Sequence, residues 1–511
     1  MSYANHYLNL YTPAQVREFD RVAIEEHNIP AIVLMKRAGR AAFDVLQAYW
    51  PEISEVHVFC GSGNNGGDGY VIAALAARSG LQASVWQLNP PKTPAAQQAC
   101  AYAEQEGAQI KPFILAAWQT IQAQISPLAV VVDALLGIGF EGELSPEYRD
   151  AIQAINTVGL PVLAADIPSG IYGETGACDD IAVNATVTVS FIAQKLGNKI
   201  GQGLVHAGRQ HLAELDVPAA VFDGAVPAAQ LLELNEALAS LPPRAVDAHK
   251  GDCGHVLVVG GDHGFGGAVA MSAQMAARSG AGLVGVATQA PNTAPIITRQ
   301  PEIMAASVAS GLELSPLLEK PSVLVLGPGL GQSAWSEQLL LHSLAAGKKM
   351  VLDADALNLL AQGELVLPQQ GKAQAQWVMT PHPGEAARLL GQTIAKVQAD
   401  RIAAAKALQK NYGGCVVLKG AGTIIVTPAQ EIFICDAGNS GMASGGMGDV
   451  LAGLLGGLIA QKMSITTATC LGVLLHSHAA DVAVEEHGQR GLLATDLIPV
   501  VTQCLKDAEQ C

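Results

Sequence analysis

The chain has 511 residues, half of them apolar and only 14% charged, with a formal net charge of −16. This length exceeds what one hydrophobic core usually spans, so we expect at least two domains. The negative charge disfavours nucleic-acid or membrane partners, since both need clustered lysine and arginine. No basic, apolar leader opens the sequence and no apolar run is long enough to span a bilayer. We therefore expect an untargeted, cytoplasmic protein.

In the first half, short β-rich runs alternate with helical patterns. We expect strands at residues 56–60, 83–88, 129–135 and 162–166, and a helix at residues 70–78. Strands that alternate with helices are typical of a doubly wound α/β sheet.

The composition changes around residues 216–243 to alanine, proline and leucine, without a strand-like run, and we place a linker there. The second half then restarts the alternation and predicts a second α/β domain. Its expected elements are a helix at 267–280 and strands at 255–259, 323–326, 350–353 and 415–418.

The segment GSGNNGGDG, residues 61–69, directly follows the first expected strand. Its first six residues fit the GxGxxG pattern of dinucleotide-binding folds. The acidic residue that such folds carry about 20 positions later is missing here. We expect residues 67–69 to extend the loop before the helix, so that two amides and a carboxylate line a phosphate-binding turn.

Three further polar loops follow strands of the first half. They contain Asp133, residues 137–143, and Asp166 with Ser169. Because the carboxyl ends of strands converge on one crevice, we expect these loops to meet. The oxygen atoms of Asn65, Asp133 and Ser169 suit an alkali or alkaline-earth cation better than zinc. Tight turns and helix caps explain any single loop, but four such loops in one domain favour a site.

The motifs GSGNNGGDG, VDALLGIGFEGE and ADIPSG resemble those of the NAD(P)H-hydrate epimerase family. The resemblance implies a Rossmann-like epimerase domain over residues 1–222, with a potassium ion held by Asn65, Asp133 and Ser169. It also implies that the hydrated cofactor contacts Asn64, Asn65, Gly66, Gly67, Asp68, Gly137, Ile138, Gly139, Phe140, Glu141, Gly142, Glu143 and Asp166.

Epimerisation at C6 of the hydrated ring breaks and remakes a bond at a carbon that bears both nitrogen and hydroxyl. A positioned acid or base helps such a step. Asp166 is the catalytic residue that we expect for it. Lys195 is a second candidate, although a solvated surface lysine explains this residue equally well.

The second half carries the sequence NSGMASGGMGD at residues 439–449, which runs into an apolar helical pattern. Glycines at the start of a helix expose N–H groups that can hold a transferring phosphoryl group. Asp449, in the first helical turn, can accept the proton of an attacking hydroxyl and is our catalytic candidate. A helix cap alone explains the aspartate but not the four glycines around it.

Four other motifs of the second half are GPGLG, LDADALN, TPHPGE and KGAGT, preceded by HKGDCGHVLVVGG. In this order they resemble the ribokinase-like fold, and specifically its ADP-dependent NAD(P)H-hydrate dehydratase branch, over residues 230–511. The sequence GMGD is compatible with this branch, whereas kinases of this fold commonly have GAGD or GTGD at the same place. The resemblance implies hydrate contacts at Ala268, Gly331, His382 and Asp449, and nucleotide contacts at Lys419, Gly420, Ala421, Gly422, Thr423 and Gly448. For His382, a structural hydrogen bond is the alternative.

We therefore expect a bifunctional enzyme with an N-terminal Rossmann-like doubly wound domain and a C-terminal ribokinase-like α/β domain. It would interconvert R and S NADHX and NADPHX, and dehydrate the S form with ADP, giving AMP and phosphate. Magnesium is expected because phosphoryl transfer uses it, and we also expect a homo-oligomer. One alternative is a small-molecule kinase fused to a ligand-binding regulatory domain. The other is a nucleotide-sensing or RNA-associated scaffold.

Overall fold

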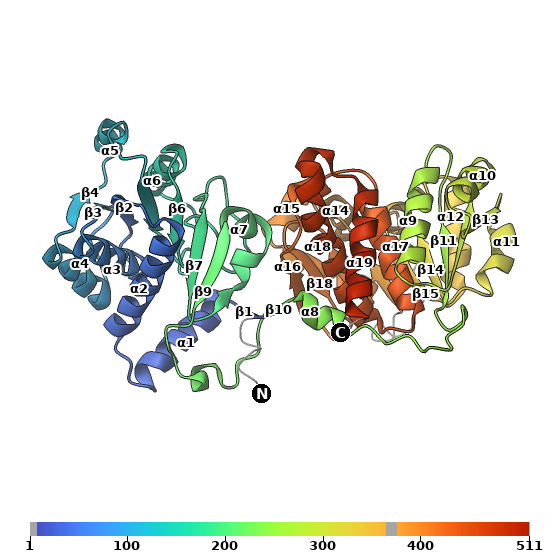
Figure 1. Cartoon of the computed structure of the whole chain (residues 1–511), viewed down its shortest axis with the longest axis horizontal. Coiled ribbons are helices and arrows are strands. Elements are labelled where there is room, and N and C mark those ends of the chain that lie inside the picture. The colour runs from blue at the N-terminus through green and yellow to red at the C-terminus, as the bar shows by residue number, and fades with distance from the viewer. Residues whose placement is uncertain (1–7, 364–375, 510–511) are drawn as a thin grey trace. The chain divides into compact units, whose positions relative to one another are not determined.

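The computed structural model describes residues 8–363 and 376–509 (Figure 1). The contacts within the chain divide it into two compact units, Met1–Gln230 and Leu231–Cys511. Among the described residues, no helix has both the length and the apolar character needed to cross a bilayer.

The first unit is built on a parallel sheet with the strand order β4-β3-β2-β5-β6-β7-β9. The chain adds β3 and β4 on one side of β2, and then returns to add the others on the opposite side. A doubly wound sheet has its binding crevice at such a reversal, here between the carboxyl ends of β2 and β5. The strands are β2 (Glu55–Cys60), β3 (Gln82–Gln87), β4 (Gln109–Pro112), β5 (Ala129–Ala134), β6 (Val162–Ala165), β7 (Val187–Phe191) and β9 (Arg209–Ala213).

Helices cover both faces of this sheet. Neighbouring residues of a strand face opposite sides, and accordingly Val58 and Cys60 of β2 belong to one hydrophobic cluster and Phe59 to another. The first cluster includes side chains of α1 to α4, and the second includes those of α5 and α6. The helical segments are α1 (Pro13–Glu25), α2 (Ala31–Tyr49), α3 (Asn64–Arg78), α4 (Pro94–Gln105), α5 (Leu115–Gln122), α6 (Pro146–Thr157), η2 (Leu196–Lys199), α7 (Gly201–His206) and η3 (Ala219–Phe222).

The glycine-rich segment after β2 is helical, so our expectation that residues 67–69 extend a loop is wrong. α3 begins at Asn64, six residues before the expected helix start. The glycines allow its first turn to pack against the preceding turn, because a Cβ on Gly66 would lie 2.1 Å from the carbonyl oxygen of Gly61. Glycine has a low helix propensity, and here the close tertiary contact outweighs it.

The segment expected to be a strand-free linker, residues 216–243, also differs from expectation. It contains a short strand, β10 (Ala229–Leu231), and a helix, α8 (Leu234–Leu238). β10 pairs antiparallel with β1 (Asn9–Tyr11), which pairs in parallel with β8 (Gln194–Lys195). A strand of three residues is too short to show alternation, so only its pairing partner defines it.

The second unit contains the strand order β13-β12-β11-β14-β15-β16-β17-β18-β19. The pairs are parallel up to β17, and β18 and β19 then add antiparallel strands. The strand order again reverses, between β11 and β14. All the strands expected in the two halves form, with ends within one residue of those expected. The strands of the second unit are β11 (His255–Val259), β12 (Leu283–Thr288), β13 (Met304–Ser307), β14 (Val323–Leu326), β15 (Lys349–Leu352), β16 (Trp377–Met379), β17 (Cys415–Leu418), β18 (Thr423–Val426) and β19 (Ile432–Cys435).

The central helix of the second unit is α17 (Met447–Ala460), which is buried on nearly every side. A helix that is apolar all round is typical of such a position. Its glycines permit close contact with α9 (Gly266–Arg278), since a Cβ on Gly453 would lie 2.1 Å from the carbonyl oxygen of Ser272. The other helical segments are α10 (Ala290–Arg299), α11 (Gly311–Leu314), η4 (Ser315–Leu318), α12 (Ala334–Ala345), α13 (Ala354–Ala361), α14 (Pro383–Leu390), α15 (Ile394–Ala399), α16 (Arg401–Tyr412), η6 (Ser440–Met442), α18 (Ile465–Gly491), η7 (Ala494–Asp496) and α19 (Leu497–Ala508).

Candidate functional site

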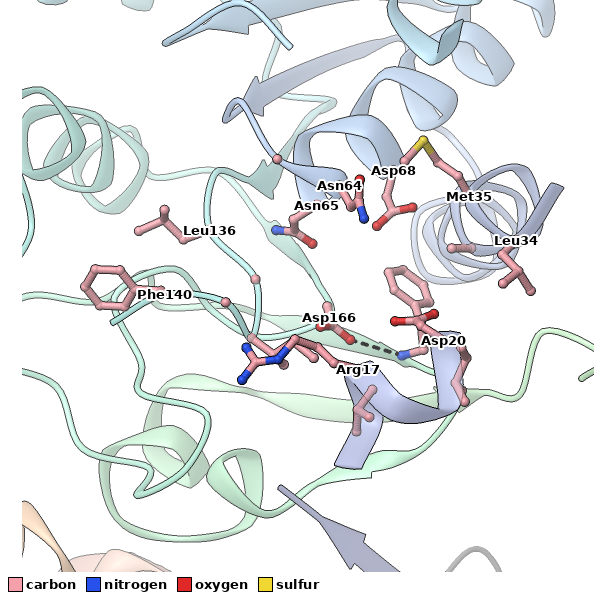
Figure 2. Close-up of a pocket in the computed structure, with 18 of the residues that line it drawn as sticks. Arg17, Asp20, Leu34, Met35, Asn64, Asn65, Asp68, Leu136, Phe140 and Asp166 are labelled. Carbon is pink, nitrogen blue, oxygen red and sulfur yellow. Dashed lines mark hydrogen bonds between the residues drawn. The ribbon is translucent and has the colours of Figure 1, made fainter. Parts of the chain in front are cut away.

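A cavity of about 540 Å³ opens at the carboxyl ends of β2 and β5 in the first unit. It lies where the strand order reverses, between the start of α3, the loop after β5 and the end of β6, and α1 and α2 close its other wall. Figure 2 shows Asn64 and Asp68 on one side of this cavity and Asp20 and Asp166 on the other. The polar loops expected to converge at the strand ends therefore face one space.

Asp166 is held at the cavity wall by a strained backbone and a buried lysine. Its φ of +69° lies in the left-handed region, which is costly for residues other than glycine. Its carboxylate accepts hydrogen bonds from the Phe191 N–H (3.3 Å) and from Lys195 Nζ. The side chain of Lys195 is only 1% exposed. The interpretation of Lys195 as a solvated surface lysine is therefore wrong.

Two more carboxyl groups face the same cavity, those of Asp20 and Asp68. Burial raises the pKa of Asp68 well above its usual range, and the carboxylates of Asp166 and Asp20 add to the effect. Burial also raises the pKa of Asp20 to about 6, against the opposing charge of Lys195. Because one lysine faces three carboxyl groups, this cluster retains a proton near neutral pH. Sequence reasoning missed Asp20, since a lone aspartate on an amphipathic helix normally faces solvent.

Asp133, in β5, and Ser169, in the loop after β6, are hydrogen-bonded to each other. The N–H of Ser169 donates to Asp133 Oδ2 (2.8 Å), and its Oγ donates to Asp133 Oδ1 (2.6 Å). The Leu135 N–H donates to the same carboxylate (3.2 Å), and the Leu136 N–H donates to Ser169 Oγ (2.9 Å). Burial nevertheless raises the pKa of Asp133 to about 6. The two side chains thus hold their oxygen atoms, which are possible cation ligands, in fixed positions next to the loop after β5.

Asn65, the third expected ligand of the cation, lies beside Gly137 of that loop, where a Cβ would approach its side chain to 3.2 Å. Both polar atoms of the Asn65 side chain are buried without a hydrogen-bond partner among the described residues. Buried amides are normally satisfied, so an unpaired one indicates a missing partner. An oxygen-binding cation such as potassium fits this donor set of amide, carboxylate and hydroxyl.

The other expected substrate contacts of the first unit divide into two groups. Gly66, Gly67, Gly142 and Glu143 are not part of the cavity wall. The first two serve the packing of α3, with Gly67 against Met35. The wall does include Asn64, Asn65, Asp68, Gly137, Ile138, Gly139, Phe140, Glu141 and Asp166.

In the second unit, Asp449 lies in the first turn of α17, after Gly446, whose φ is +93°. Burial raises the pKa of Asp449 to about 7, the carboxylate of Asp353 adds to the effect, and Lys419 opposes it. Lys419 Nζ donates to Asp353 Oδ1 at 2.9 Å. A Cβ on Gly448 would lie 3.1 Å from Asp353 Oδ2. The start of α17 is thus fitted closely against this ion pair.

A buried histidine contacts the first turn of α17. His476 Nε2 lies 3.0 Å from the carbonyl oxygen of Met447, and burial lowers the pKa of His476 to about 4. The ring is therefore neutral at physiological pH and donates this hydrogen bond. It positions the turn that carries Asp449 and adds no charge beside it.

Gly331, an expected hydrate contact, is the last residue of the GPGLG loop, and Ala268, a second one, lies beside this loop. The N–H of Gly331 donates to Asp355 Oδ2 at 2.9 Å. A Cβ on Gly329 of the same loop would lie 3.1 Å from the Cβ of Ala268. The carboxylate of Asp355 acts electrostatically on Asp449. The structure therefore brings Gly331 to the neighbourhood of Asp449.

His382 is the N-cap of α14, and its ring makes the structural hydrogen bond that was the alternative explanation for it. Its Nδ1 accepts from the Gly384 N–H at 2.9 Å, and the His382 N–H donates to Glu385 Oε2 at 2.8 Å. Half of the side chain remains exposed. Burial lowers the pKa of His382, and the charge of Lys419 adds to this. A structural role and a ligand contact through the exposed part of the ring are therefore compatible.

Two family models match this chain, one described as NAD(P)H-hydrate dehydratase over residues 256–503, the other as YjeF-related protein N-terminus over residues 31–197. Among solved structures, a ribokinase-like superfamily protein from Enterococcus faecalis V583 is similar, with a TM-score of 0.50 and 31% sequence identity. The match covers 55% of this chain and 96% of that chain. The mixed α/β fold with a ribokinase-like second unit is therefore confirmed.

Full-length relatives carry both parts. The bifunctional NAD(P)H-hydrate repair enzyme Nnr of Coxiella burnetii is 47% identical over 96% of this chain and 98% of that protein. The enzyme of the same name from Escherichia coli K12 is 40% identical, over 94% of this chain and 91% of that protein. The chain belongs to the family of bifunctional NAD(P)H-hydrate repair enzymes. Family membership excludes both alternatives from the sequence, a kinase with a regulatory domain and a binding scaffold.

Proposed function

We propose that residues 1–222 interconvert the R and S forms of NADHX and NADPHX, and that residues 230–511 dehydrate the S form with ADP. The observation that carries this proposal is the placement of Asp449 in the first turn of α17, beside the glycine turn and the Lys419–Asp353 pair. This arrangement offers a base and an anion-binding helix start to the same reacting group. The related full-length enzymes carry the same pair of domains.

In the second unit, Asp449 takes the proton of the C6 hydroxyl as that oxygen attacks the terminal phosphorus of ADP. The amides at the start of α17 stabilise the charge on the transferring group. AMP leaves, and the hydrate then carries a phosphate ester at C6. The C6–O bond of this ester breaks, phosphate departs with the bonding electrons, and C5 loses a proton, which restores the ring double bond. A hydroxyl is a poor leaving group, and its phosphorylation makes it a good one.

Magnesium, when bound, would supply positive charge that offsets the negative charge of the nucleotide phosphates. The carboxylates that interact with Lys419 include those of Asp353 and Glu385, which are hard oxygen donors. Burial raises the pKa of Glu385 to about 7, with Lys419 opposing. A carboxyl group that ionises reluctantly without a cation fits a position beside a bound metal.

In the first unit, Asp166, paired with Lys195, is the proposed base, and Asp68, whose pKa burial raises well above its usual range, faces it as a proton source. Exchange at C6 needs a proton for the departing oxygen and a base for the incoming water. Bond breaking and re-addition of water to either face then give both epimers, with no net change in composition.

The experiment that tests the proposal offers the protein a mixture of both epimers of hydrated NADH with ADP. Recovery of dihydronicotinamide absorbance from the whole mixture is expected, since the first unit supplies the second. No recovery with ADP or ATP would contradict the assignment. An accumulating phosphorylated hydrate would instead indicate a kinase.

The dehydration rate is expected to rise with pH and to level off above about pH 7, because only the ionised carboxylate of Asp449 accepts a proton. The raised pKa keeps this group protonated in acid, so at pH 6 about a tenth of the molecules carry the active base. The measurement is kcat for pure S hydrate at saturating ADP across this range. A flat profile in acid, with the protein folded throughout, would remove Asp449 as the base.

Removal of potassium is expected to slow epimer exchange by about tenfold or more, and to leave dehydration of pure S hydrate unchanged. The proposed ligands all belong to the first unit. Substitution of Asn65→Leu should abolish the response to potassium, whereas Asn184→Leu, at an exposed asparagine of the same unit, should keep it. Exchange that is equally fast in tetramethylammonium and in potassium would contradict the cation site.

A further inference from the structure

Arg401, the first residue of α16, is a buried arginine, and its hydrogen-bond partners among the described residues are all carbonyl oxygens. Arg401 is 2% exposed, and no carboxylate within the described residues forms an ion pair with it. Nη1 donates to the carbonyl oxygens of Ala421 and Gly422 (3.1 Å for the latter). Nη2 donates to those of Leu418 (3.3 Å) and Lys419 (3.2 Å).

A guanidinium in this position is expensive for the fold. A buried charge needs a counter-charge or a full set of hydrogen bonds, and an apolar side chain of similar volume would be easier to bury. Burial lowers the pKa of Arg401 to about 10, so the group is still a cation at neutral pH. A buried arginine at this position therefore calls for a role beyond packing.

The four carbonyl groups belong to the turn between β17 and β18, which is the proposed nucleotide loop. In a trans peptide the C=O and the following N–H point in opposite directions. The N–H groups of Gly420 and Gly422 therefore face away from the guanidinium. Neither has a backbone partner among the described residues, whereas the Lys419 N–H donates to the carbonyl oxygen of Pro381 (2.9 Å).

Both glycines adopt backbone conformations that other residues rarely take, with φ of +139° at Gly420 and +63° at Gly422. Successive amides turned to one side by such conformations form a concave anion-binding surface. The contact with Arg401 is tight, since a Cβ on Gly420 would lie 2.8 Å from Arg401 Nη2. The guanidinium and the turn thus fix each other's shape.

We infer that Arg401 is a positioning residue for the nucleotide, because it gathers the carbonyl groups of Leu418, Lys419, Ala421 and Gly422 on one side and thereby presents the Gly420 and Gly422 N–H groups to the nucleotide phosphates on the other. The inference rests on the proposed binding of ADP at residues 419–423. In this inference Arg401 does not contact the nucleotide. It acts through the backbone of the turn.

The test measures KM for ADP and kcat for dehydration of S hydrate in the full-length protein carrying Arg401→Met or Arg401→Lys. Arg401→Met is expected to raise KM for ADP by about tenfold or more, with a much smaller change in kcat, because two charge-assisted hydrogen bonds to phosphate are weakened. Arg401→Lys, which keeps the charge without the fork, should give an intermediate KM. Lys406→Met removes an exposed cation from the same helix and should match the wild type.

A purely structural role makes a different prediction. It would lower the fraction of folded enzyme, and hence the apparent kcat and the unfolding temperature, at an unchanged KM for ADP, and that result would overturn the inference. If Arg401→Met does not fold, Gly420→Ala provides a second variant. Its added methyl group would push the guanidinium away from the loop, and it is expected to raise KM for ADP as well. An unchanged KM in Arg401→Lys and Gly420→Ala would then overturn the inference.

A loop variant separates failure of the inference from failure of the nucleotide site. Gly422→Val forces a β-branched residue into the left-handed region and reshapes the turn while the Arg401 side chain itself is unchanged. If Gly422→Val raises KM for ADP and the Arg401 variants do not, the loop binds nucleotide and the inference alone is wrong. If neither changes KM for ADP, the assignment of the loop to the nucleotide is wrong, and the inference falls with it.

Discussion

Replacement of Asp449 by asparagine is expected to slow dehydration by about 10² to 10⁴-fold, the usual contribution of a general base. Asparagine keeps the shape of the side chain but cannot take the proton of the C6 hydroxyl. Epimer exchange is expected to continue at the wild-type rate, because its proposed residues all lie in the first unit. The measurement compares absorbance recovery from pure S hydrate at saturating ADP with interconversion of the epimers, followed by chromatography.

The same substitution should not destabilise the second unit. The pKa of Asp449 is raised to about 7, so the folded state disfavours the charged carboxylate. The contribution of this group lowers the free energy of unfolding as the pH rises from about 4 to about 7, and the full cost is present above pH 7. The neutral amide removes this cost, and the unfolding temperature at about pH 8 should equal or exceed that of the wild type. Asp507→Asn, at an exposed aspartate of α19, is the control that should change neither property. A folded Asp449→Asn enzyme with near-normal dehydration would refute the assignment.

Replacement of Asp166 by asparagine is expected to slow epimer exchange by about 10² to 10⁴-fold and to leave dehydration of pure S hydrate intact. It should also destabilise the first unit, because Lys195 is 1% exposed and would lose the carboxylate with which it is directly paired. Removal of one partner of a buried ion pair typically costs about 3 to 5 kcal/mol. The loss of activity alone would therefore be ambiguous.

The double variant Asp166→Asn with Lys195→Met resolves this ambiguity. It removes the unpaired ammonium, so the unfolding temperature should recover relative to Asp166→Asn alone, while epimer exchange should stay slow. Recovery of exchange together with stability would mean that Asp166 serves the fold and not the chemistry. Loss of both activities in a folded protein would contradict the division of labour between the two units.

The sequence was sufficient for those parts of the molecule that depend on local pattern. Buried parallel strands read as short apolar runs, and each one ends at a polar loop, so both the sheets and the convergence of their loops were predictable. The start of α3 was not, because its glycines oppose a helix by propensity and are explained only by contacts such as that of Gly66 with Gly61. β10 was missed for a similar reason, since its partner β1 lies far away in the sequence.

The chemistry of the sites was predictable only where it followed a motif. Asp166 and Asp449 stand in conspicuous glycine-rich contexts. Asp20 instead lies on an amphipathic helix, where charged residues usually face solvent, and Arg401 lies at the start of a helix whose sequence shows no marked apolar face. Their burial results from tertiary packing against segments distant in sequence. No local pattern carries that information. For the same reason the sequence does not distinguish between a catalytic role and a surface position for Lys195.

The glycine contacts of α17 limit how the second unit can operate. Gly453 lies against the backbone of α9, and a Cβ on Gly457 would come within 2.0 Å of Ser279 Oγ. At 1.5 Å of rise per residue, Gly457 lies about 12 Å along the axis from Asp449. A helix that packs this tightly has no room to slide or rotate, so the carboxylate of Asp449 keeps a fixed position. Stereochemical discrimination then depends on where the docked ring places its hydroxyl, and a hydrate of the wrong hand presents hydrogen where the base needs oxygen.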